Sequence, residues 1–108
     1  MSSRSKYNAV KTTVDGIQFD SKREAARYQE LRLLEKAQEI SDLKTQVPFL
    51  LIPKCGKNRA IYYYADFTYF DSRTGDDVVE DCKGCRTEVY RLKKKLMKWL
   101  HWIDIKET

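Results

Sequence analysis

The stretch Val78-Val79-Glu80-Asp81-Cys82-Lys83-Gly84 is the part of the chain from which the fold can be worked out. Two β-branched residues that lead toward a closing glycine predict a short strand. Side chains alternate along a strand, so Val79, Asp81 and Lys83 share one face. A carboxylate and an ammonium group beside apolar side chains are costly to bury without a function. The stretch therefore indicates either metal-assisted phosphodiester chemistry or an exposed strand end whose two charges pair.

The length of 108 residues suits a single domain with one core. We expect a flexible basic tail over residues 1–11 and one domain over residues 12–108. No apolar run approaches the ~20 residues needed to span a bilayer, and the N-terminus lacks the apolar stretch of a signal peptide. These features predict a cytoplasmic protein with no membrane partner.

Charge is distributed unevenly within a net charge of +5. Residues 71–81 hold five acidic side chains and one arginine, and residues 86–98 hold six basic side chains and one glutamate. This order suits a site that binds a cation and a polyanion together, although two solvated surfaces would give the same pattern. The three cysteines form an odd set without a secretory signal, which indicates reduced thiols. Their spacing matches no common zinc module.

The N-terminal part predicts a hairpin followed by a helix. Asp15-Gly16 is a strong turn signal between two short strands. Ser21 and Glu24 form a capping box at the start of a helix that runs to about Ala37. Glu24 has two interpretations: its carboxylate completes the cap and does nothing more, which the pattern alone favours, or it points toward the edge of a sheet as a site residue.

Residues 43–52 predict an extended apolar strand, which Pro48 either places at a sheet edge or breaks. Gln46 in this strand is a candidate for the same cleft as the acidic residues. Residues 53–59 form a basic turn, which either contacts phosphates or is a solvated hairpin tip. Its cationic side chains are Lys54, Lys57 and Arg59.

Residues 60–70 predict the strongest strand, and we expect both of its largely apolar faces to be covered. Asp66 is the exception, and an aspartate in the middle of an aromatic strand needs a backbone, basic or metal partner. A turn at residues 71–76 returns the chain antiparallel. Pairing across this turn places Asp66 near Asp81, within reach of one shared ion.

The C-terminal part predicts a helix capped by Thr87 that runs to about Leu100, followed by a short strand over residues 101–105. The apolar spacing predicts a buried stripe formed by Val89, Leu92, Leu96 and Trp99. The basic residues of this helix, which include Arg91 and Lys94, remain solvated or contact DNA.

The order of these features resembles the PD-(D/E)XK nuclease superfamily, whose core runs αβββαβ. The motif positions here are Glu24, Asp66 and Asp81-Cys82-Lys83. More narrowly, residues 19–25, 64–67 and 79–84 look like a family of small phage-encoded proteins of unknown function that is similar to Holliday-junction resolvases. The resemblance implies an α/β fold (an α+β sandwich) with a restriction-endonuclease-like core, in which helices flank a mixed sheet.

The chain departs from the superfamily pattern at two points. Ala65 stands where a proline precedes the aspartate in the superfamily. Glu80 competes with Asp81 for the third acidic position, because a slip of one residue exchanges the two faces of a strand.

The resemblance also implies a Mg²⁺ or Mn²⁺ site. Asp66 and Asp81 would be direct ligands, with the Cys82 backbone carbonyl as a third. Glu24 would bind a second cation or a metal-bound water, and Lys83 would position or deprotonate the attacking water. The flanking phosphates would be held by Lys54, Lys57, Arg59, Arg91 and Lys94.

Three functions remain open from the sequence. The first is a Mg²⁺-dependent endodeoxyribonuclease of phage recombination or replication, such as a junction resolvase, which would work as a homodimer to cut both strands. The second is a non-catalytic DNA-binding or regulatory module that retains the fold. The third is a small interaction protein whose charges are only solvated.

Overall fold

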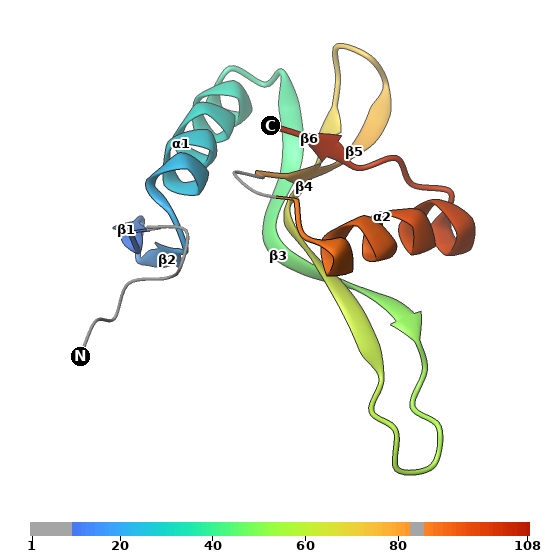
Figure 1. Ribbon diagram of the computed structural model, residues 1–108. Coiled ribbons are helices and arrows are strands. Elements are labelled where there is room, and N and C mark those ends of the chain that lie inside the picture. The colour runs from blue at the N-terminus through green and yellow to red at the C-terminus, as the bar shows by residue number, and fades with distance from the viewer. Residues whose placement is uncertain (1–9, 83–85) are drawn as a thin grey trace, which may run out of the picture.

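The fold is seen in a computed structural model that describes residues 10–82 and 86–108 (Figure 1). From the first helix onward the elements follow the order αβββαβ, so the predicted α/β class is confirmed. Of the residues described, none belongs to a helix long and apolar enough to cross a membrane. Most of the predicted N-terminal tail, residues 1–9, lies outside the described residues. The elements are β1 (Thr12–Val14), β2 (Ile17–Phe19), α1 (Lys22–Lys36), β3 (Ile40–Ile52), β4 (Ile61–Asp71), β5 (Asp76–Asp81), α2 (Glu88–His101) and β6 (Lys106–Glu107).

The N-terminal hairpin and the first helix form where the sequence predicts them. Asp15 and Gly16 both adopt positive φ angles, 52° and 76°, as a tight two-residue hairpin turn requires. Ser21 caps α1, because its hydroxyl oxygen accepts a hydrogen bond from the Glu24 amide at 3.1 Å. The buried face of α1 includes Tyr28 and Leu31.

The main sheet has the strand order β3-β4-β5-β6. The first two pairings are antiparallel and the last is parallel, so the sheet is mixed, as predicted. β3 lies at the edge, which explains why Pro48 is tolerated within it. The ends of β3 and β4 that are joined by residues 53–60 project as an arm away from α1 (Figure 1).

Two clusters of buried side chains form the core. Phe67 and Tyr69 of β4 pack in the cluster that includes α1, whereas Tyr63 and Ala65 pack in the cluster that includes α2. The strand therefore passes from one cluster to the other at Asp66. This position accounts for a carboxylate in the middle of an aromatic strand, because it lies between the two apolar clusters.

The prediction that both faces of β4 are covered is wrong. The odd-numbered residues 63–71 are buried, but Tyr62, Tyr64 and Phe70 in the other row are exposed. Tyrosine combines an apolar ring with a hydroxyl that can remain in water, so a row of aromatic residues does not require cover on both sides.

The prediction for the buried stripe of α2 is also wrong, although its Thr87 cap is confirmed at 3.1 Å from the Tyr90 amide. Val89, Leu92 and Trp99 are 63%, 58% and 78% exposed, and of the predicted stripe Leu96 alone packs against the core, only partly buried. Tyr90 and Met97 are buried instead.

Contacts with the arm explain this orientation of α2. The Lys93 ammonium group donates a hydrogen bond to the Tyr62 carbonyl at 2.9 Å, and His101 Nε2 lies 2.7 Å from the Leu50 carbonyl. Both contacts favour the orientation in which Tyr90 and Met97 face the sheet.

The predicted final strand over residues 101–105 is wrong as well. His101 belongs to α2, and Trp102 ends the helix with a left-handed φ of 60°. Ile103 and Ile105 reach the α2 cluster without strand pairing. The last strand, β6, begins only at Lys106.

Candidate metal and nucleic-acid site

Strand pairing brings Asp66 next to the end of β5. The paired rows of β4 and β5 run from Asp71↔Asp76 to Phe67↔Glu80, so the next positions along the two strands are Asp66 and Asp81. The Cys82 backbone amide donates a hydrogen bond to Asp66 Oδ2 at 2.8 Å. The expectation that Asp66 and Asp81 lie close together is therefore confirmed.

Gln46 joins the group from the opposite neighbour of β4. The pairs Thr45↔Phe67 and Val47↔Ala65 place it across from Asp66, and its φ of 50° interrupts the regular course of β3. Its side-chain amide donates to Asp66 Oδ1 at 3.2 Å and lies 3.5 Å from Glu24 Oε2. The prediction that Gln46 points into the same cleft is confirmed.

Glu24 faces these residues from the first turn of α1. It is only 6% exposed, and of its two interpretations the structure supports the one in which it points toward the sheet. Burial, together with the negative charges of Asp66, Asp20 and Asp81, raises the pKa of Glu24 to about 8. Ionising Glu24 beside these carboxylates is therefore unfavourable, and a bound cation would offset the repulsion.

Asp81 and Glu80 are both buried, but they face different surroundings. Asp81 is 2% exposed and accepts a hydrogen bond from the Tyr63 hydroxyl. Glu80 is 0% exposed and accepts two hydrogen bonds from the Arg27 guanidinium, at 2.8 and 2.7 Å, and one from the Tyr69 hydroxyl.

The partners of Glu80 explain its ionisation. Burial alone would raise the pKa of Glu80, but the hydrogen bonds from Arg27 and Tyr69 outweigh burial and hold the pKa below its usual range. Glu80 is thus an ionised carboxylate already neutralised by an arginine. Asp81, and not Glu80, lines a cavity with Asp66.

This carboxylate cavity has a volume of about 320 Å³. Its lining includes Gln46, Asp66 and Asp81, and also Asp20, Tyr63 and Lys93, which no sequence pattern indicated. Strand alternation places Tyr63 in the row opposite to Asp66, so it did not indicate Tyr63 as a site residue. Lys93 gave no signal beyond its place in a basic helix.

Lys83 and Cys82 also belong to the Asp-x-Lys motif. Lys83 lies outside the described residues, so its expected place beside Asp81 stays a prediction. Cys82 directly follows β5, and burial raises the pKa of its thiol to about 11. The thiol therefore remains protonated at neutral pH, and a backbone carbonyl is the more suitable donor at this residue.

The donor set suits a hard divalent cation, since Glu24, Asp66, Asp81 and the Gln46 side-chain oxygen all offer oxygen atoms. The arrangement is not a ready-made metal centre: among residues 10–82 and 86–108, no three Cys, His, Asp or Glu side chains are grouped to hold an ion. Asp66 uses both carboxylate oxygens for hydrogen bonds, and Asp81 uses Oδ2. A cation would have to replace some of these hydrogen bonds.

The candidate phosphate-binding residues fall into two separate groups. Lys54, Lys57 and Arg59 are exposed at the end of the arm. Arg91 is exposed on α2, and the Lys94 ammonium group binds Glu107 Oε2 at 3.0 Å. The structure does not bring the two groups to one place (Figure 1).

Comparison with known proteins gives one family. The family model described as "Protein of unknown function (DUF1064)" matches residues 4–108. No curated protein and no solved structure matches the chain.

Proposed function

Since the chain belongs to the DUF1064 family, whose description states no function, we propose a function from its site: a metal-dependent DNA endonuclease. Membership of the PD-(D/E)XK nuclease superfamily is part of this proposal. The substrate would be branched or duplex DNA, such as a Holliday junction formed in phage recombination or replication. The place of action would be the cytoplasm of the bacterial host.

The single observation that carries the proposal is the convergence of Glu24, Asp66 and Asp81 from three different elements. Strand pairing and a shared cavity bring Asp66 and Asp81 together, and the Gln46 side chain bridges Asp66 and Glu24. Gathering these carboxylates, of which Glu24 and Asp81 are buried, raises the free energy of the fold unless a cation or a proton offsets their repulsion. A metal-dependent function explains why the chain keeps this arrangement.

The roles of the residues follow from their chemistry. Asp66 and Asp81 would hold Mg²⁺ or Mn²⁺ together with the Cys82 carbonyl, and Glu24 would bind a second cation or a metal-bound water. When bound, the cation would supply Lewis-acid stabilisation of the phosphate charge and lower the pKa of water. Lys83 would position or deprotonate the attacking water.

Cleavage of DNA tests the proposal. Labelled branched, duplex and single-stranded DNA is incubated with the protein in Mg²⁺, in Mn²⁺ and in EDTA. We expect cleavage only with metal, and a loss of about 100-fold or more in Asp81→Asn and Asp66→Asn. The matched control is Asp77→Asn, which removes an exposed carboxylate from the same strand. Cleavage in EDTA, or equal losses in Asp77→Asn and Asp81→Asn, would contradict the proposal.

A comparison of two lysine variants identifies which ammonium group acts on the attacking water. Lys83→Ala should abolish cleavage if the resemblance assigns the role correctly. Lys93 lines the same cavity, so Lys93→Ala is the informative comparison. A loss in Lys93→Ala alone would transfer the role from Lys83 to Lys93 of α2.

A second candidate function is a DNA-binding or regulatory module without catalysis. The observation in its favour is that both Asp66 carboxylate oxygens and Asp81 Oδ2 accept hydrogen bonds from other parts of the protein. DNA binding that survives Asp81→Asn, without cleavage in either metal, would support this function.

A further inference from the structure

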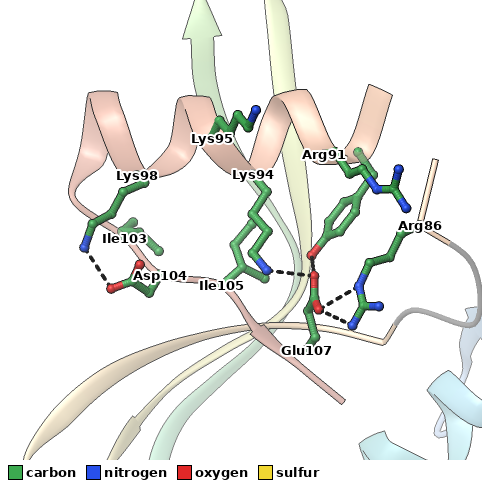
Figure 2. Close-up of a pocket in the computed structure, with 10 residues that line it drawn as sticks. Arg86, Arg91, Lys94, Lys95, Lys98, Ile103, Asp104, Ile105 and Glu107 are labelled. Atoms are coloured by element: carbon green, nitrogen blue, oxygen red, sulfur yellow. Dashed lines mark hydrogen bonds and ion pairs between the residues drawn. The ribbon is translucent and has the colours of Figure 1, made fainter. Parts of the chain in front are cut away.

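A second cavity lies between α2 and the C-terminal segment that leads to β6 (Figure 2). This α2 groove has a volume of about 410 Å³. That volume falls within the ~300–1,000 Å³ typical of small-ligand pockets, and it is far too small to enclose a DNA duplex. The groove is therefore suited to a small ligand or to one unit of a polymer.

The groove carries an excess of positive charge. Its lining contains five cationic side chains, Arg86, Arg91, Lys94, Lys95 and Lys98, and two carboxylates. Glu107 binds Arg86 at 2.6 Å and Lys94 at 3.0 Å, and Asp104 binds Lys98 at 2.8 Å (Figure 2).

Arg91 and Lys95 remain available to a ligand. Both are exposed, and within the described part of the chain neither forms an ion pair. Five cations against two carboxylates leave three positive charges in the groove. An anionic ligand would offset this excess.

The groove also has an apolar part. Ile103 and the buried Ile105 line it beneath α2, and both belong to the α2 core cluster. A small inorganic anion would leave this aliphatic surface in water. A ligand that combines a phosphate with a flat apolar group would use both surfaces, and a nucleotide within an unpaired strand has this combination.

The groove adjoins the carboxylate cavity. Tyr90 lines both, and the parallel pairing Asp81↔Glu107 places a residue of each on neighbouring strands. Neighbouring β-strands lie about 4.8 Å apart. A DNA strand held in the groove would therefore lie next to the carboxylate cavity.

We propose that the α2 groove binds an unpaired DNA strand beside the carboxylate cavity. This inference rests on the proposed function for the identity of the polymer, and it adds that the substrate has a single-stranded segment. Arg91 and Lys95 hold the phosphates, and the Ile103 and Ile105 surface accepts a base or sugar.

Binding in EDTA tests the inference without cleavage. Fluorescence anisotropy is measured with a labelled thymidine oligomer of about 12 nucleotides, an abasic oligomer of equal length and a hairpin duplex. We expect the thymidine oligomer to bind more tightly than either of the others. Equal or tighter binding of the duplex or of the abasic oligomer would overturn the inference.

Charge reversals locate the binding. Arg91→Glu and Lys95→Glu should each weaken binding of the thymidine oligomer on the order of tenfold, because each adds a repulsive charge to the groove. Lys36→Glu is the matched control, since it makes the same charge change at an exposed position of α1. Thermal melting confirms that each variant is folded. Equal losses in Lys36→Glu and Lys95→Glu would also overturn the inference.

The two proposals fail in different ways. If the α2 groove binds the thymidine oligomer as expected but no metal supports cleavage, the nuclease proposal fails and the inference about the groove still stands. If cleavage needs Asp81 but Arg91→Glu and Lys95→Glu bind like the control, the groove inference fails alone.

Discussion

At the scale of single residues, Glu80 and Asp81 show how strand alternation separates two functions. Neighbouring side chains on β5 point to opposite faces. Glu80 therefore meets Arg27 and Tyr69, whereas Asp81 meets Tyr63 and the carboxylate cavity. Glu80 therefore stabilises the fold, and Asp81 is the candidate metal ligand.

Glu80→Gln should destabilise the protein strongly. Removing one partner of a buried ion pair typically costs about 3–5 kcal/mol, because the other charge is left uncompensated. Arg27 is partly exposed, so we expect the lower end of this range. Urea unfolding measures the change, with the exposed Asp77→Asn as control. A change as small as that of the control would show that the Arg27 contact contributes little.

Glu24→Gln should stabilise the protein above acidic pH when EDTA removes divalent ions. The pKa of Glu24 rises from an ordinary 4.5 to about 8 in the fold, so the folded state binds a proton more tightly than the unfolded state. The wild type therefore loses stability as the pH rises from about 4.5 to 8, by at most a few kcal/mol. The neutral glutamine does not titrate, so the two proteins should differ least near pH 4.5.

Melting temperatures of wild type and Glu24→Gln, measured at pH 5, 6, 7, 8 and 9, check this expectation. The difference should grow up to about pH 8 and then remain constant. A difference that does not change with pH would mean that Glu24 has the same pKa in the folded and unfolded states.

At the scale of elements, α2 has three distinct sides. Tyr90 and Met97 face the core, and Arg91 and Lys95 belong to the α2 groove. The third side is the exposed row Val89, Leu92, Leu96 and Trp99, of which Leu96 is partly buried. The spacing of this row, i, i+3, i+7 and i+10, is that of a coiled-coil seam. The row that looks like the core side in the sequence is therefore suited to a partner helix.

At the scale of the whole molecule, this row suits a two-fold dimer. Monomeric proteins rarely expose a contiguous apolar row of this kind. A symmetric dimer places the same helix on both sides of its axis, so the row would cover itself. Val89 also lines the carboxylate cavity, so pairing of the rows would bring two such cavities to one interface.

The mass in solution tests the dimer. We expect light scattering after size exclusion to give twice the chain mass of 12.8 kDa. Leu92→Asp and Trp99→Asp should restore the monomer, since a buried charge at the seam costs several kcal/mol. Leu33→Asp is the control, because Leu33 is an exposed leucine on α1. A monomeric wild type across the micromolar range would contradict the expectation.

The sequence by itself determined the local features of this protein. The Asp15-Gly16 turn, the two helix caps and the order of elements follow from neighbouring residues, because turns and caps depend on contacts only a few positions apart. The approach of Asp66 to Asp81 was also predictable, since a short connection fixes the register of an antiparallel pair.

Only the tertiary structure decided which side of α2 is buried, which partner neutralises Glu80 and which residue bridges Glu24 and Asp66. Periodicity locates an apolar side of a helix, but it cannot choose between two apolar sides when contacts such as Lys93 with Tyr62 orient the helix. Arg27 lies 53 positions from Glu80, and Gln46 lies 20 positions from Asp66. Such contacts form only when distant elements pack together, so no local pattern in the chain encodes them.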